Sequence, residues 1–480
     1  MQKSQIKLYY KNVMADVIDD EHGISNRQWA DLEKKVEPLI PLMMKEIVGH
    51  PRHPDMTPTR YGLLPANEQI ARDVKEHVEE LKEGCRNLVV LGIGGSALGN
   101  IALQTALNPY MYNLDEKQRR GPRLFVFDNV DPAQFDSFLH WVVESDQLDN
   151  TLFNVISKSG QTAETASQLL IVRQILLDKI GPEGFRRQVI ATTDAHKGTL
   201  RTLADQAKLR TLEVPDDVGG RFSVLSAVGL FSAAMCGIDI DELLAGARDM
   251  HDRVSNESFK ENPAAINAAI HYHYYHRGKK NSVIMPYAYA LKDMANWYRQ
   301  LWAESLGKQL DLDKREVWIG PTPLKALGAT DQHSQVQLYR EGPNDKLFTF
   351  LQVENLDGDS ELVIGPAPDS APEFDYLAGK KMSMLLNSEK MATEFAILHD
   401  KRPCLTVLFD RVTPYAVGQF IFLLEVTTSF AGALFNINPY DQPAVELGKE
   451  ATFALMGKEG YENFAREIQL KTEIDEDYLV

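Results

Sequence analysis

The sequence has few cysteines, no surplus of positive charge and no long uninterrupted apolar run. Three cysteines occur in 480 residues, at Cys85, Cys236 and Cys404, without CxxC spacing. Such a sparse, odd-numbered set argues against a disulfide framework or a zinc site. Asp and Glu (68) outnumber Lys and Arg (51), giving a formal net charge of −17. Proteins that bind nucleic acid broadly carry the opposite bias, so we expect no nucleic-acid partner.

Membrane and secretory signals are equally weak. The most apolar stretch, Val412–Leu424, is interrupted by Glu425 and is too short to span a bilayer. It predicts a buried helix, and we expect no membrane partner. The first residues lack the apolar segment of a signal peptide, so we expect a cytoplasmic protein. Hydrophobic residues make up 44% and charged residues 25% of the chain, which is typical of a globular protein, and the length predicts more than one domain.

Short apolar runs alternate with helical stretches along most of the chain, in two series. The first series has apolar runs at residues 87–93, 124–127, 152–156 and 189–192. The second has runs at 282–285, 317–319, 347–353 and 405–409, with helices expected at 291–305, 332–340 and 414–434. This alternation predicts an α/β fold with two mostly parallel sheets covered on both faces. We expect a helical segment at 1–80, α/β domains at 81–235 and 236–444, and a helical arm at 445–480.

Two loops between a predicted strand and a predicted helix have the composition of anion sites. The first, Gly92–Gly99, is rich in glycine, which lets backbone N–H groups approach a ligand at a helix N-terminus. It lacks the Gly-Lys-Ser/Thr of a Walker A loop, and a tight turn explains it equally well. The second, Ser157–Thr165, combines a lysine with several hydroxyls. Helix capping by Thr162 accounts for one hydroxyl only, so we favour a phosphate monoester site there.

An arginine and a glutamate are candidates for chemistry on the reacting carbons. Arg221 follows Gly219-Gly220, and a fixed guanidinium can stabilise an oxyanion. The alternative is a solvated arginine on a surface turn. Glu304 lies at the edge of the apolar face of the helix expected at 291–305, with Gln300 one turn earlier. A carboxylate in the last turn opposes the helix dipole, which favours a role as a proton-transferring base, although a salt bridge to Lys308 is the alternative.

Three further features have both a functional and a structural interpretation. His333 follows a glycine-containing loop at the expected start of a helix, a position suited to proton exchange near pH 7. Lys449 follows Pro443, and a surface lysine is the simpler interpretation. The histidines at 271, 273 and 276 suggest a metal, but only two of them share a helix face. A structural helix is the better interpretation, and no metal site is expected.

Together and in this order, these segments resemble the glucose-6-phosphate isomerase family, in its shorter bacterial form. Residues 216–223 resemble the family's first signature, with Gly-Gly-Arg-aromatic-Ser intact. Residues 435–449 resemble the second, in Tyr440-Asp441-Gln442, Val445-Glu446 and Lys449, and depart from it at Ala444, where glycine is usual. Residues 157–165 resemble the phosphate loop of sugar-isomerase (SIS) domains. The resemblance covers residues 91–449 and implies two SIS domains.

The resemblance also implies an activity and a role for each matching residue. The activity is the reversible isomerisation of glucose 6-phosphate and fructose 6-phosphate through an enediolate, without metal or cofactor, in a homodimer to which the neighbouring subunit contributes His333. Glu304 would be the base and Arg221 would stabilise the enediolate, while His333 and Lys449 would open the sugar ring. The residues implied in substrate or phosphate binding are Gly95, Ser96, Ser157, Lys158, Ser159, Thr162, Gln300 and Gln442.

Two other functions would use parts of the same sequence. A non-catalytic SIS protein that senses sugar phosphate would need the loop at 157–165 but not Glu304, His333 or Lys449. Such proteins often carry a basic DNA-binding segment, and none is evident here. A dehydrogenase using Gly92–Gly99 would need an acidic ribose partner about 20 residues on. The next predicted strand ends at Asp128, which is too far.

Overall fold

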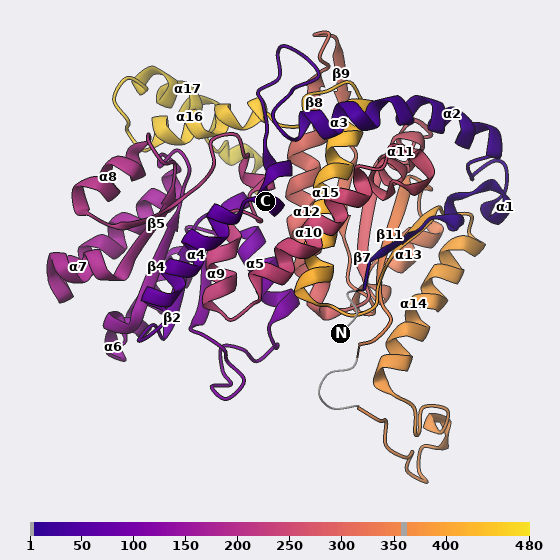
Figure 1. Cartoon of the computed structure of the whole chain (residues 1–480), viewed down its shortest axis with the longest axis horizontal. Coiled ribbons are helices and arrows are strands. Elements are labelled where there is room, and N and C mark those ends of the chain that lie inside the picture. The colour runs from indigo at the N-terminus through magenta and orange to yellow at the C-terminus, as the bar shows by residue number, and fades with distance from the viewer. Residues whose placement is uncertain (1–3, 357–361) are drawn as a thin grey trace. The chain divides into compact units, whose positions relative to one another are not determined.

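The computed structural model describes residues 4–356 and 362–480. They form two compact units, residues 1–439 and residues 440–480, and each is described by itself. The larger unit contains both predicted sheets. Four helices stand between them (Figure 1): α5 (Leu98–Leu107), α10 (Ile240–Val254), α12 (Lys292–Leu306) and α15 (Pro414–Leu434). The α/β fold with mostly parallel sheets is therefore confirmed, while the four-part domain division stays a prediction.

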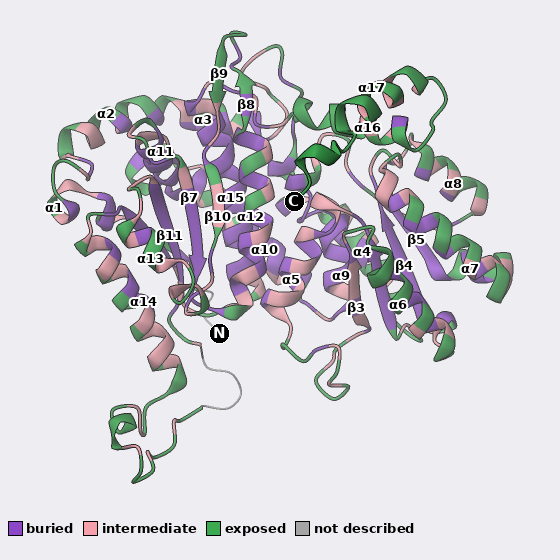
Figure 2. Ribbon diagram, turned by 180° about the vertical axis from the view of Figure 1, so that it is seen from behind, coloured by how far each residue is buried: buried purple, intermediate pink, exposed green. Residues whose placement is uncertain are grey.

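The first sheet has five parallel strands in the order β3-β2-β4-β5-β6. Every residue of β2, β4 and β5 is buried, as expected for apolar strands covered on both faces. Helices α6, α7 and α8 supply the apolar core on one face, and their outer surfaces are exposed (Figure 2). The strand bounds are Asn87–Leu91 (β2), Arg123–Phe127 (β3), Thr151–Ile156 (β4), Val189–Thr193 (β5) and Arg210–Glu213 (β6).

The second sheet has the order β1-β12-β11-β7-β10, parallel except for β1. One prediction about it is wrong. The run at 317–319 lies in β9 (Glu316–Ile319), which pairs with β8 (Lys308–Leu310) in a separate antiparallel hairpin. The segment at 1–80 contains α1 to α4 and also contributes the short edge strand β1, which was not predicted. The strands of this sheet are Lys7–Tyr9 (β1), Asn281–Pro286 (β7), Thr322–Lys325 (β10), Lys346–Val353 (β11) and Cys404–Phe409 (β12).

Local sequence chemistry explains where several helices begin. Ser25 and Gln28 form a capping box at the start of α2, and Asp131 caps α6, which has Pro132 in its first turn. In the first half of the chain the helices are Ala15–Ile18 (α1), Asn26–Val36 (α2), Ile40–Glu46 (α3), Glu68–Leu81 (α4), Leu98–Leu107 (α5), Pro132–Glu144 (α6), Ala163–Gln188 (α7, broken at Gly181), Thr199–Ala207 (α8) and Ala227–Met235 (α9).

Helix α15 (Pro414–Leu434) is the central helix of the larger unit. It packs against α10 (Ile240–Val254), α11 (Pro263–His276) and α12 (Lys292–Leu306). Of the described helices it alone is long and apolar enough to cross a membrane by composition, and 94% of its apolar window is buried inside the protein. The prediction of a buried helix is thus confirmed. The remaining helices are α13 (Val336–Glu341), α14 (Met382–His399) and, in the smaller unit, α16 (Glu446–Leu455) and α17 (Glu462–Thr472).

Candidate functional site

The two candidate anion loops lie at the same edge of the first sheet. Strands β2 and β4 are parallel neighbours, and residues 92–99 and 157–165 follow their carboxyl ends. The chain passes from β2 outward to β3 and returns to β4 on the other side of β2. This reversal is the topological switch point at which open α/β sheets bind ligands.

Glycines bring the first loop against two other parts of the site. A Cβ atom on Gly95 would lie 2.2 Å from the carbonyl oxygen of Gly220, so no side chain fits between the two turns. Gly94 has a φ of +56°, and a Cβ there would lie 2.8 Å from Gln300 Nε2. The turn Gly94–Ser96 therefore lies beside both the Gly-Gly-Arg segment and helix α12.

The hydroxyls of the second loop are bonded within the loop. Ser157 Oγ lies 3.2 Å from Thr162 Oγ1 and accepts from the N–H of Gly160 at 3.1 Å. Ser159 Oγ accepts from the N–H of Gln161 at 3.2 Å. Thr162 occupies the N-cap of α7 but makes no side-chain capping bond. Capping therefore does not account for its hydroxyl, and the N-terminus of α7 remains an electropositive end suited to an anion.

Lys158 ties this loop to the segment that carries Arg221. Its Nζ donates to the backbone oxygens of Asp216 and, at 3.2 Å, Val218. Burial lowers the pKa of this lysine, and the charges of nearby aspartates, Asp216 foremost, act in the opposite direction. The predicted contact of Lys158 with phosphate stays a prediction, and in this structure the ammonium joins the two loops.

On the prediction that this loop binds a phosphate monoester, we expect Thr162→Ala to raise the KM for that substrate about tenfold, because a hydrogen bond to a charged group would be lost. The kcat should change less than about threefold, since the role predicted for Thr162 is in phosphate binding and not in proton transfer. Steady-state kinetics measure both values. Thr202→Ala, which removes an exposed hydroxyl on α8 bonded to Gly198, is the control. An unchanged KM in Thr162→Ala would place the phosphate elsewhere.

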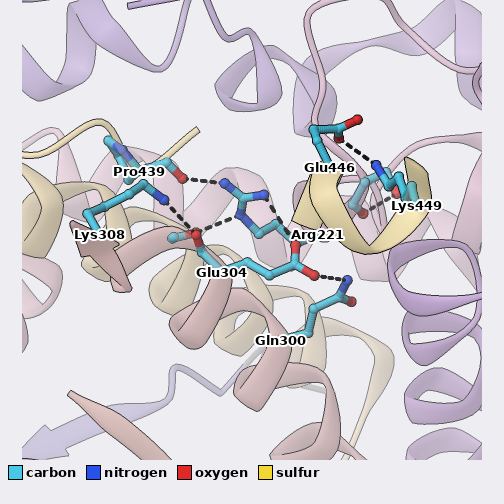
Figure 3. A network of polar contacts seen from close by, with 10 residues as sticks. Arg221, Gln300, Glu304, Lys308, Pro439, Glu446 and Lys449 are labelled. Carbon is cyan, nitrogen blue, oxygen red and sulfur yellow. Dashed lines mark hydrogen bonds and ion pairs between the residues drawn. The ribbon is translucent and has the colours of Figure 1, made fainter. Parts of the chain in front are cut away.

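Helix α12 presents the candidate base. The Glu304 side chain is 33% exposed. Its Oε1 accepts from Gln300 Nε2 at 2.9 Å, and its Oε2 lies 3.3 Å from Arg221 Nη1 (Figure 3). The carboxylate is thus paired with Arg221, while Lys308 Nζ donates to the backbone oxygen of Glu304 at 2.7 Å. Gln300 orients the base from one turn away, and its predicted role in phosphate placement stays a prediction.

Arg221 is a buried arginine. Its side chain is only 2% exposed, so the alternative of a solvated surface turn is wrong. Nε donates to Ser305 Oγ at 2.7 Å and Nη2 to the backbone oxygen of Pro439 at 2.6 Å. Sequence reasoning missed both partners. Ser305 directly follows the candidate base, but nothing in its residue type points to Arg221, which lies 84 positions away.

The surroundings of His333 differ from the prediction. His333 is exposed and caps a short 3₁₀ turn at Thr330–Gln332, and α13 begins only at Val336. It therefore lies outside the first turn of a helix. The cause is Asp331, which accepts from the N–H of Leu327 at 2.7 Å and from Ser334 Oγ at 2.5 Å. Such side-chain bonds compete with helix formation.

The smaller unit holds the other two predicted residues. Gln442 is the N-cap of the 3₁₀ turn Pro443–Val445. Lys449 is exposed on α16, and its Nζ lies 2.7 Å from Glu446 Oε1 (Figure 3). Ala444, in place of the family's usual glycine, lies in that turn and is not among the residues with positive φ, so a Cβ is tolerated there.

The histidines of α11 form no metal site. His271 is buried, with Nδ1 3.0 Å from the Asn267 oxygen and Nε2 3.1 Å from Ser282 Oγ. Burial lowers the pKa of His271 to about 4. Within residues 4–356 and 362–480, no group of three or more His, Cys, Asp or Glu side chains is arranged to hold a metal ion.

The arrangement offers a carboxylate base, a buried guanidinium beside it and an electropositive loop at a topological switch point. The model of the phosphoglucose isomerase family matches residues 64–464. The chain belongs to this family. The resemblance on which the sequence prediction rested is thereby confirmed, and neither alternative function is supported.

Family members of established name cover most of the chain. A glucose-6-phosphate isomerase of Carboxydothermus hydrogenoformans is 50% identical over 402 residues, covering 84% of this chain and 85% of that protein. Another, of Rubrobacter xylanophilus, is 40% identical over 456 residues, covering 93% of this chain and 100% of that protein.

Solved structures share the fold. The crystal structure of a hypothetical protein from Thermus thermophilus matches with a TM-score of 0.80 and 31% identity, covering 94% of this chain and 100% of that chain. A glucose-6-phosphate isomerase from Chlamydia trachomatis matches with a TM-score of 0.78 and 21% identity, covering 97% of this chain and 96% of that chain. The second comparison shows the fold alone.

Proposed function

We propose that this member of the phosphoglucose isomerase family interconverts glucose 6-phosphate and fructose 6-phosphate. The observation that carries the proposal is the Glu304 carboxylate, partly exposed and held between Gln300 and Arg221. Aldose–ketose isomerisation needs one base that takes a proton from one carbon and returns it to the next. It also needs a positive group for the oxyanion that forms in between.

The steps follow from these groups. The phosphate binds at residues 157–162, and His333 and Lys449 open the sugar ring by moving a proton to the ring oxygen. Glu304 then takes the proton from C2 of the open aldose, and the electron pair forms the C1–C2 double bond of an enediolate. Arg221 stabilises its negative oxygen. Glu304 returns the proton to C1 as the hydroxyl proton of C2 moves to the C1 oxygen, which gives the ketose.

A coupled assay tests the activity. Purified protein receives fructose 6-phosphate with EDTA and no added metal, and glucose 6-phosphate is measured with a linked dehydrogenase. The expected result is turnover that the chelator does not reduce. Binding of fructose 6-phosphate in calorimetry without turnover would overturn the proposal in favour of a sugar-phosphate sensor. Absence of both binding and turnover would refute sugar-phosphate use altogether.

We further propose a cytoplasmic homodimer in which each subunit completes the other's site with His333. The three cysteines are all unpaired thiols, as expected in a reducing compartment. The exposed loop of His333 adjoins α14, because Gln332 Nε2 donates to the Glu389 oxygen at 3.2 Å. Helix α14 exposes large apolar side chains, among them Phe395 (71%) and Met391 (62%). A second copy covering this face would bury them.

Complementation between two inactive variants tests the shared site. In a mixed dimer of Glu304→Gln and His333→Ala, one site would hold both intact residues and the other neither. Half of the dimers in a random mixture are mixed, so co-expression should restore about a quarter of the wild-type activity if the subunits associate symmetrically. Each variant purified alone is the control. No restoration in mixed dimers isolated with two different affinity tags would place His333 and Glu304 of one chain in the same site.

A further inference from the structure

The guanidinium of Arg221 is held from three directions. Nε donates to Ser305 Oγ at 2.7 Å, Nη2 to the Pro439 oxygen at 2.6 Å, and Nη1 lies 3.3 Å from Glu304 Oε2. Two of these contacts come from adjacent residues of α12. Figure 3 shows the guanidinium between α12 and the Pro439 segment.

Ser305 is placed to set the orientation of this group. Its side chain is fully buried, and it occupies the last turn of α12 next to the base. A guanidinium is planar, with its donors fixed in that plane. Bonds from Nε and Nη2 to two fixed acceptors therefore define the plane and the direction in which Nη1 points. In this structure that direction is toward the Glu304 carboxylate.

We propose that Ser305 is a positioning residue, which orients Arg221 toward the carbon atoms that Glu304 deprotonates. The proposal rests on the isomerase function proposed above. Because α12 carries both Ser305 and Glu304, one rigid element fixes the base and the direction of the cation together. A shift of α12 would move Glu304 and the Ser305 hydroxyl together and would preserve their relative position. Precise placement of an enediolate-stabilising group matters most in the transition state.

Loss of the Ser305 hydroxyl should therefore lower kcat. Ser305→Ala removes the acceptor that the Ser305 hydroxyl gives to Nε–H of Arg221, so this bond no longer fixes the plane of the guanidinium. We expect kcat to fall about tenfold and KM to stay within about twofold, the pattern of an interaction made in the transition state. Ser305→Thr, which keeps the hydroxyl, should retain kcat within about threefold.

A double-mutant cycle separates positioning from a structural role. Arg221→Met keeps an extended side chain but has no N–H for Ser305 to accept. In that background Ser305→Ala should lower kcat less than about twofold, because the interaction is already gone. Ser282→Ala is the matched control, since Ser282 is also buried and bonds to Tyr298 of α12 at 2.9 Å, away from Arg221. It should leave kcat unchanged and show no coupling to Arg221→Met.

The outcomes are distinguishable, and thermal melting of every variant shows which ones fold. A tenfold loss in Ser305→Ala that vanishes in the Arg221→Met background supports the proposal. The same loss in both backgrounds would show that Ser305 supports α12 alone, and an unchanged kcat would show that Arg221 needs no such acceptor. Either result overturns the inference while the isomerase activity of the unaltered protein stands. An inactive unaltered protein would instead refute the function on which it rests.

Discussion

Replacement of Glu304 by glutamine should lower kcat by about three orders of magnitude, the middle of the range for loss of a general base. The amide keeps the size of the side chain but cannot take a proton from carbon. Substrate affinity should remain, because the loop at 157–162 is untouched. Calorimetry with fructose 6-phosphate should therefore give a Kd within about threefold of the unaltered protein.

The contacts of the Glu304 carboxylate show what else this substitution changes. The carboxylate accepts from Gln300 at one oxygen and faces Arg221 with the other, whereas an amide has one oxygen and can satisfy only one of them. A small loss of thermal stability is thus expected in the variant and must be measured beside the kinetics. Glu316→Gln, at an exposed position on β9, is the matched control. Turnover at the normal rate in Glu304→Gln would remove Glu304 as the base.

The sequence predicted those parts of the fold that local pattern determines. The continuous apolar runs that became β2, β4, β5, β11 and β12 are buried on both faces, and such runs leave a strong signal. The two anion loops could be assigned for the same reason, because each follows such a strand. Helix α12 was predicted from its apolar face, which also placed Gln300 and Glu304 one turn apart.

Short elements that depend on distant partners could not be predicted. Strand β1 has three residues, of which Lys7 and Tyr9 are exposed, and it exists because β12 offers an unpaired edge. Strand β6, Arg210–Glu213, has three polar residues out of four and likewise forms at the edge of a sheet, where it pairs with β5. The apolar run at 317–319 was assigned to the wrong sheet, since residue type does not distinguish a hairpin strand from an edge strand.

The same limit applies to the site. The candidate residues were found individually, but their mutual contacts span long distances in sequence, such as the 83 positions from Arg221 to Glu304. Burial of Arg221 depends on Ser305 and on the Pro439 carbonyl, and a backbone oxygen carries no sequence signal. His333 was placed at a helix start because Gln332–Arg340 has helical composition. The bonds of Asp331 delay the helix, and composition alone does not reveal them.

The buried carboxyl of Glu425 predicts an unusual dependence of stability on pH. Glu425 lies in the middle of α15, is fully buried, and neither of its carboxyl oxygens has a hydrogen-bond partner among the described residues. Burial raises its pKa well above the ordinary value for glutamate, so the folded protein keeps this proton to a higher pH than the unfolded chain does. The unfolded chain releases the proton above a pH of about 4.3.

The direction in which stability changes with pH follows from this difference between the folded and the unfolded pKa of Glu425. The contribution of Glu425 to the stability of the folded protein is complete below the pKa that this group has in the unfolded chain. It is lost progressively as the pH rises toward the higher pKa that the group has in the folded protein. The loss grows over the pH range in which the unfolded chain is ionised at this position while the folded protein keeps the proton. Glu425→Gln presents a neutral group of the same size at every pH. The variant should therefore melt at a higher temperature than the unaltered protein at pH 8, and the gap should narrow toward pH 5.

Thermal melting at several pH values, with Glu76→Gln as the control, tests this expectation. Glu76 is an exposed residue of α4, so its replacement should shift the melting temperature little and equally at each pH. A gap between Glu425→Gln and the unaltered protein that stays constant from pH 5 to pH 8 would show that Glu425 does not carry the pH dependence. A gap that grows with pH would identify this single carboxyl as the reason why the larger unit loses stability in alkali, because no other group changes between the two proteins.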